Sequence, residues 1–187
     1  MASRLRRKLL KASAIMLFLP VYNVASKAYS DTDKPLQPLI DILRAIGKPV
    51  CVHAAETLSE TRVADKSYSL HLRNADLNSK DAEQIGRSIN MVHAQHDIRL
   101  RSFSASYNIG LGKQGIGHLL AGLPDHLGEL GLVDCNLDDA SAYLIIEFIA
   151  RSQSLQMICV EDNNFSASVK DDIRAAGAKL DSCVTIV

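Results

Sequence analysis

The chain has no tryptophan, and aromatic residues make up only 5% of its 187 residues. A fold organised around a large buried indole is therefore excluded. Long apolar runs are also scarce: the stretch at 12–25 is shorter than the roughly 20 residues of a membrane-spanning helix, and Pro20 and Asn23 interrupt it. The remaining composition, 47% apolar and 22% charged, is typical of one folded soluble domain preceded by a short leader.

Net charge is also lacking, since 21 basic residues balance 21 acidic ones. This balance hides a division along the chain. Residues 1–30 hold six basic side chains and no acidic one, so the remainder has 15 basic against 21 acidic residues, or −6. Phosphate binding depends on a concentration of lysine and arginine. A mature domain this acidic is not expected to bind nucleic acid.

Residues 1–30 predict an export signal, because a basic segment precedes the apolar stretch and small residues precede the polar Asp31. Ala28 and Ser30 satisfy the small-x-small rule for cleavage after Ser30, and an earlier site after Ser26 is an alternative. We therefore expect a periplasmic or secreted protein, without membrane insertion once the leader is removed. An uncleaved leader that tethers the protein to a membrane is the second interpretation.

The export route stays open between two possibilities. The segment Arg6-Arg7-Lys8-Leu9-Leu10-Lys11 resembles the twin-arginine motif, although Leu9 stands where phenylalanine is usual and Leu5 where serine or threonine is usual. That route would imply that the protein folds before export. Adjacent arginines also occur in general secretory signals, which is the alternative.

A short aliphatic pattern recurs four times in the second half of the chain. Its clearest copy is Leu127-x-x-Leu130-x-Leu132-x-x-Cys135-x-Leu137. The equivalent positions Leu70, Phe103, Leu130 and Ile158 are 33, 27 and 28 residues apart, and a period of this size is typical of a repeat array. In each copy the aliphatic-x-aliphatic pair predicts a short strand, which a helical apolar pattern follows. Strand–helix units in series imply parallel strands and an α/β fold.

The helical patterns predict which side chains are buried after each strand. These residues are Ala82, Ile85 and Ile89; Ile116, Leu119, Leu120 and Leu123; Ala140, Leu144, Ile145 and Ile149; and Val169, Ile173 and Ala176. Gly177 is expected to end the last helix, and 184–187 to add a final strand.

The segment 33–66 is expected to cap the first repeat, because terminal units of an array must cover an open end of the core. Residues 33–47 predict a helix that Gly47 ends. Residues 50–52 predict a short strand, and 54–66 a loop with some helix. The repeats then extend over 67–187.

The repeated pattern resembles the leucine-rich repeat, in the long form found in ribonuclease inhibitor. The resemblance covers roughly residues 67–177 as about four units, and it is partial in the first, where Ala75 takes the place of the usual asparagine or cysteine. It implies a short arc with parallel strands on the concave face, helices on the convex face, and protein binding as the function. It also implies that Asn108, Cys135 and Asn163 are buried and bond the backbone of neighbouring turns.

A second motif competes with this interpretation. Gly110-x-Gly112-x-x-Gly115 follows a predicted strand and opens a predicted helix, and Asp134 lies 19 residues beyond Gly115. This is the context of a dinucleotide-binding fingerprint. However, strands of a doubly wound sheet are apolar on both faces, whereas His71 and Arg73 alternate with leucines here. An exported dinucleotide-dependent enzyme therefore remains the alternative.

Other candidates for chemistry are weaker. His93-x-x-His96 has no third metal ligand at suitable spacing, and Cys51-x-His53 lacks an orienting partner for a catalytic dyad. Cys159 and Cys183 fall on adjacent predicted strands, and we expect them to be unpaired. We therefore expect no catalytic residue, metal or cofactor.

The residues between the inward aliphatics would line one face of the predicted sheet, basic at its N-terminal end and acidic at its C-terminal end. Partner-binding residues are predicted to be His71, Arg73, Arg101, Tyr107, Glu129, Asp134, Met157 and Glu161. Polarity for solubility alone is the alternative explanation. The sequence thus predicts an exported, non-enzymatic module that binds another protein and has the capacity to self-associate; a membrane-tethered structural envelope protein is a further alternative.

Overall fold

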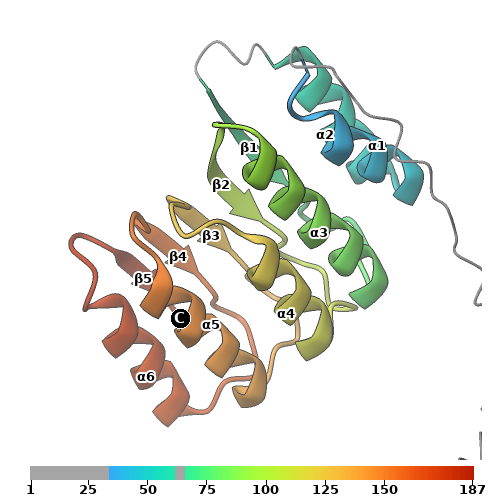
Figure 1. Cartoon of the computed structure of the whole chain (residues 1–187). Coiled ribbons are helices and arrows are strands. Elements are labelled where there is room, and N and C mark those ends of the chain that lie inside the picture. Colours follow the sequence, from blue (N-terminus) through green and yellow to red (C-terminus); the bar gives the residue numbers. More distant parts are fainter. Residues whose placement is uncertain (1–33, 62–65) are drawn as a thin grey trace, which may run out of the picture. The chain divides into compact units, whose positions relative to one another are not determined.

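The computed structural model describes residues 34–61 and 66–187, so the predicted export signal lies outside the described residues. The described residues form six helices and five strands (Figure 1). In chain order these are α1 Gln37–Ile46, α2 Pro49–Glu60, β1 Ser67–His71, α3 Ser79–Gln95, β2 Arg99–Ser104, α4 Gly112–Gly122, β3 Glu129–Gly131, α5 Asp139–Arg151, β4 Met157–Cys159, α6 Ala167–Gly177 and β5 Val184–Ile186.

All five strands are parallel and lie in the sheet in the order in which the chain makes them. Leu70 pairs with Phe103, Phe103 with Leu130, and Leu130 with Ile158. The positions aligned by the sequence period therefore lie side by side in one row. This confirms the predicted α/β class and the parallel strands, including the final strand, in which Thr185 continues the row.

Helices α3 to α6 lie on one side of the sheet (Figure 1). The residues that face them, in the strands or directly after them, are buried, namely Leu70, Leu72, Phe103, Ala105, Leu130, Leu132, Ile158 and Val160. The predicted apolar residues of the helices are also buried, except that Ala140 and Leu144 are only half-buried. We call the opposite side, which these helices leave uncovered, the open face.

The segment at 50–52, predicted to be a strand, is instead part of helix α2. Pro49 occupies the first turn of the helix, where its missing N–H costs nothing. The buried residues Cys51, Ala54, Ala55 and Leu58 form an apolar stripe at helical spacing. The helix continues to Glu60, into the segment predicted as a loop with some helix. The prediction for Gly47 is confirmed, since it ends α1 in the left-handed conformation at φ 72°.

Helices α3 and α4 approach so closely that their backbones touch. A Cβ atom on Gly122 would lie 2.2 Å from the carbonyl oxygen of Gly86, and one on Gly86 would lie 2.3 Å from that of His118. These distances are below any real contact, so both positions require glycine for packing rather than for a turn.

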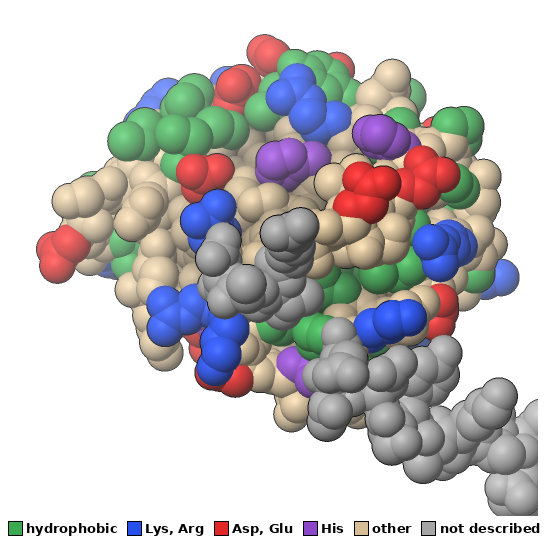
Figure 2. Space-filling view, turned by 90° about the horizontal axis from the view of Figure 1, so that it is seen from above, with side chains coloured by type: hydrophobic (Ala, Val, Ile, Leu, Met, Phe, Trp, Pro, Cys, Tyr) green, Lys and Arg blue, Asp and Glu red, His purple; other side chains and the backbone are tan. Residues whose placement is uncertain are grey.

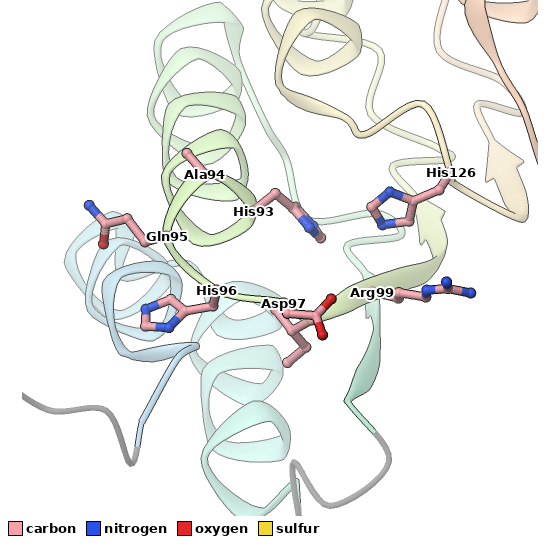
Figure 3. Close-up of a pocket in the computed structure, with 8 residues that line it drawn as sticks. His93, Ala94, Gln95, His96, Asp97, Arg99 and His126 are labelled. Carbon is pink, nitrogen blue, oxygen red and sulfur yellow. The ribbon is translucent and has the colours of Figure 1, made fainter.

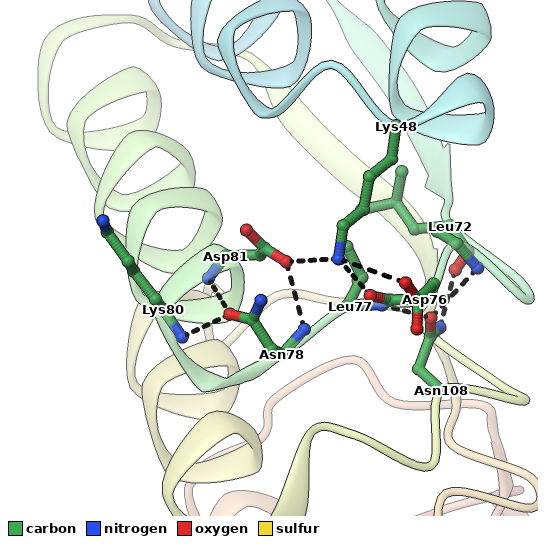
Figure 4. A network of polar contacts seen from close by, with 9 residues as sticks. Lys48, Leu72, Asp76, Leu77, Asn78, Lys80, Asp81 and Asn108 are labelled. Atoms are coloured by element: carbon green, nitrogen blue, oxygen red, sulfur yellow. Dashed lines mark hydrogen bonds and ion pairs between the residues drawn. The ribbon is translucent and has the colours of Figure 1, made fainter.

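The joint between the cap and the first repeat is polar (Figure 4). Lys48, between α1 and α2, donates to the carboxylate of Asp81 at 2.8 Å and to the backbone carbonyl of Asp76. Asp81 also accepts from the backbone N–H of Asn78, whose side chain caps α3 in return. One lysine thus connects the two-helix cap to the start of α3 and to the first turn.

Candidate functional site

The turns that follow the strands share one backbone conformation. Asn74, Tyr107, Asp134 and Asp162 occupy equivalent positions, with φ values of 51°, 63°, 49° and 60°. Asparagine and aspartate adopt this left-handed conformation several-fold more readily than other non-glycine residues, and a bulky side chain there is a true outlier. Tyr107 is therefore the exception among four equivalent turns.

Side chains of the turns hold this conformation in place. Asn108 accepts from the N–H groups of Ala75 and Leu77 at 3.0 and 2.9 Å, and its amide donates to the carbonyls of Leu72, Ala105 and Ser106. Asn163 makes the same five bonds in the third and fourth turns.

Cys135 occupies the equivalent position between these two asparagines. Its thiol lies 3.3 Å from the carbonyl oxygen of Ala105, to which it donates, and burial raises the thiol pKa. Asn108 and Cys135 are buried as predicted, but Asn163 is only half-buried, because only the short strand β5 follows it.

The residues of the open face stand in rows across the sheet. Ser69, Ser102, Glu129, Met157 and Val184 form the first row, and His71, Ser104, Gly131, Cys159 and Ile186 the second. Backbone bonds continue the pairing into the turns, where Asn74 donates to Ser106, Tyr107 to Val133, and Asp134 to Glu161. Arg73, Ser106, Val133 and Glu161 therefore form a third row.

Three of the predicted binding residues meet at the ends of the strands. Arg73, Tyr107 and Asp134 line an open hollow of about 580 Å³, together with Asn74, Asp76, Asn108 and Ile109. The Arg73 guanidinium carbon lies 4.9 Å from the centre of the Tyr107 ring, which is a cation–π contact. Ile109 is 68% exposed and was not predicted; its only signal in the sequence is an isolated apolar residue in a polar turn.

Arg101 and Glu129 lie at the other ends of the strands. The pairing of β1 with β2 shifts between Tyr68 and Ser69, so that two successive residues of β2, Arg101 and Ser102, both point away from the core. Arg101 and Glu129 are exposed. His71 Nε2 lies 3.1 Å from Ser102 Oγ, so His71 contacts this end of the neighbouring strand.

The charged groups of the open face form no ion pairs within the described part of the chain. None of the ion pairs among residues 34–61 and 66–187 involves Arg73, Arg101, Glu129 or Glu161. Glu161 is half-buried, and its Oε2 atom is covered without a hydrogen-bond partner. Burial, and then the carboxylates of Glu161 and Glu129, raise the pKa of the Cys159 thiol. A covered carboxylate oxygen without a hydrogen-bond partner costs free energy.

Tyr68 is buried on the side of β1 that faces away from the open face, against α3. Its hydroxyl lies 3.2 Å from His93 Nε2, and the two rings stack. His93 in turn lies edge-on to His126, with ring centres 5.3 Å apart. Burial, with His126 as the second cause, lowers the pKa of His93 to about 4. This half-buried imidazole is therefore neutral at pH 7.

His93 and His96 do not converge on a metal, because His96 points away from the other two histidines (Figure 3). A second observation agrees: no group of three or more metal-ligating side chains occurs among the described residues. Cys51 is also unsuited to a catalytic dyad. It is buried, and desolvation raises its thiol pKa to about 11, while His53 is exposed.

Two of the three glycines of the competing motif pack against the preceding repeat, while a Cβ atom on Gly112, at φ 55°, would meet nothing within 4 Å. A Cβ atom on Gly110 would lie 3.0 Å from the carbonyl oxygen of Leu77, and one on Gly115 would lie 3.2 Å from Cα of Ser79. The strand order contains no reversal, which is where doubly wound sheets bind dinucleotides. Dinucleotide binding thus stays a prediction that this geometry does not favour.

Two further findings concern the surface and the helices. On the face seen in Figure 2, lysine and arginine side chains occur singly or in small groups among acidic, apolar and neutral ones. Among the described helices, none has the length and apolar character needed to cross a membrane.

Comparison of the chain with protein-family models and with curated proteins finds no match.

Proposed function

We propose that this chain is an exported, non-enzymatic module of leucine-rich repeats that binds another protein through the open face of its sheet. The open face would be the concave side of a short arc, and α1 and α2 would cap the array. Three features support this proposal: the repeated register, the asparagine and cysteine bonds between turns, and helices on only one side of the sheet.

The observation that carries the proposal is Tyr107. Three equivalent turns use asparagine or aspartate in the left-handed conformation, whereas this turn uses a tyrosine, which costs about 1 kcal/mol. The side chain is 40% exposed, so it is not retained for core packing. A strained, exposed aromatic residue stacked on an arginine is typical of a binding surface. Polarity for solubility does not explain it.

The proposal predicts that a substitution of Tyr107 affects the stability of the fold and the binding of the partner in opposite directions. Replacing Tyr107→Asn should leave the free energy of unfolding unchanged or raise it by up to about 1 kcal/mol, because asparagine tolerates the turn. Partner binding should fall. Urea unfolding and partner capture, measured on the same preparations, would check both. A Tyr107→Asn variant that captures as well as the wild type would contradict the role of Tyr107.

The wider test uses a variant with Arg73→Glu, Arg101→Glu and Tyr107→Ala. Captures from the exported fraction would be compared with the wild type and with a matched control on the helical side, Lys80→Glu, Lys113→Glu and Tyr143→Ala. We expect a partner that the wild type and the control retain and the open-face variant loses. Equal capture by all three would place binding elsewhere. Intrinsic redox or hydrolase turnover would refute a non-enzymatic role.

Export is part of the proposal and has its own measurement. N-terminal sequencing of the exported protein should begin after residue 30 or after Ser26. A mature chain that retains residues 1–30 would instead support the membrane-tethered alternative.

A further inference from the structure

The charges of the open face change sign between the second and third strands. The turn after β1 carries Arg73, and β2 carries Arg101. β3 carries Glu129, and β4 continues into Glu161. The positive half and the negative half each span two neighbouring strands of the sheet (Figure 1). Such a face is complementary to a partner with the reverse order of charge.

A second copy of this chain offers that reverse order. If two open faces stack about a two-fold axis that runs parallel to the strands between β2 and β3, β1 of one copy faces β4 of the other, and β2 faces β3. Arg73 and Glu161 belong to the same row, so each then lies opposite the other in the partner copy. Arg101 and Glu129 lie near the same end of their strands, and they are opposed in the same way. Both pairs form twice by symmetry.

The side chains of the face fit this stacking. Packed sheets lie about 10 Å apart, a gap that an extended arginine and a glutamate together can span. The middle row has only Ser104 and Gly131 in its two central strands, so small side chains line the centre of both faces.

We propose that the partner bound by the open face is a second copy of the same chain, in this two-fold arrangement. This inference rests on the proposed function, because it uses the same face, and it names the occupant. Arg73 and Glu161 lie on strands separated by two others, so they are too far apart to pair within one chain. Their complementarity is therefore intermolecular. An unrelated protein on this face is the competing outcome.

The test uses the full chain and measures mass in solution by sedimentation equilibrium. Arg73→Glu and Glu161→Arg should each weaken dimerisation at least about 100-fold, because each reversal turns two attractions into two repulsions. An equimolar mixture of the two variants should form a heterodimer, since both contacts are then between opposite charges again. Lys113→Glu, on the exposed start of α4, is the control and should dimerise like the wild type.

A second pair guards against misfolding at the half-buried Glu161. Arg101→Glu and Glu129→Arg are both at exposed positions, and their mixture should also restore the dimer. A wild type that stays monomeric at about 1 mM would overturn the inference. If such a monomer still captured a different protein through Arg73 and Tyr107, the proposed function would stand without it. A dimer that survives all four reversals would place self-association elsewhere and also overturn it.

Discussion

Replacing Asn108→Ala tests whether the turns are held by the asparagine side chain. Asn108 is 1% exposed and makes five hydrogen bonds, two as acceptor and three as donor. The substitution removes the side chain that accepts from the N–H groups of Ala75 and Leu77. Because Asn108 is buried away from bulk water, those two groups would lose their hydrogen-bond acceptor.

The magnitude follows from the two orphaned donors. A buried polar group without a partner costs about 1–3 kcal/mol, so two of them cost about 4 kcal/mol. Domains of this kind have total stabilities of roughly 5–15 kcal/mol. The variant should therefore lose a large fraction of its stability but still fold. Asn163→Ala is the matched control, because it removes the same five bonds at a half-buried position.

Water can replace much of what the Asn163 side chain supplies, so its loss should cost about 2 kcal/mol or less. Urea unfolding followed by circular dichroism would give both values, and an unchanged m-value would show that the denatured state is the same. The reasoning fails if Asn108→Ala costs under about 1 kcal/mol, or if both variants lose the same amount.

Three other expectations follow from the packing. Gly122→Ala should destabilise the fold by about 2–3 kcal/mol. Gly117→Ala should be neutral or raise stability by up to about 1 kcal/mol, because its Cβ atom would be in ordinary van der Waals contact with Leu144. Thermal unfolding would compare the two variants. The free energy of unfolding of the wild type should fall by about 2 kcal/mol between pH 6.5 and 4, allowing for solvent screening, because only the unfolded state protonates His93 in this range. In pH-dependent urea titrations, His93→Gln should make this fall smaller. Half-buried Cys159 should react with a maleimide at least about 100-fold faster than buried Cys135 in the native protein, and mass spectrometry would detect the difference. Equal rates would contradict the burial of Cys135.

The sequence predicted the sheet well because the repeat determines its register. Once Leu70, Phe103, Leu130 and Ile158 are aligned, equal repeat geometry places them next to each other. Periodicity therefore carried information about tertiary contacts between strands and not only about local structure. The bonding role of Asn108 and Cys135 was implied instead by the resemblance to leucine-rich repeats, and both side chains do bond neighbouring turns.

The cap was predicted less well because it is not part of the period. The run Val50-Cys51-Val52 has the composition of a strand, but its extension to Leu58 completes a helical stripe against the core. Packing on the first repeat outweighed the local β preference. Nothing in the local sequence reveals this, because the surface that covers the stripe is supplied by residues later in the chain.

The histidine cluster was missed for a related reason. The spacing His93-x-x-His96 suggested one helical face, but α3 ends at Gln95 and the chain turns extended at His96. His93 instead meets His126, from the segment before β3, and Tyr68 of β1. Such contacts depend on which loops the repeats bring together, and spacing within one helix does not contain that information.

The division of roles in the turns determines what can vary without loss of the fold. The buried bonds come from Asn108, Cys135 and Asn163, while Arg73 and Tyr107 make no bond with their side chains that holds a turn in place. The positions that shape the turns are thus separate from those that face a partner. Charge reversals at the exposed Arg73, Arg101 and Glu129 should therefore change association while leaving the free energy of unfolding nearly unchanged. If they unfolded the protein instead, the exposed charges would be structural, and neither the binding face nor the two-fold pairing would survive.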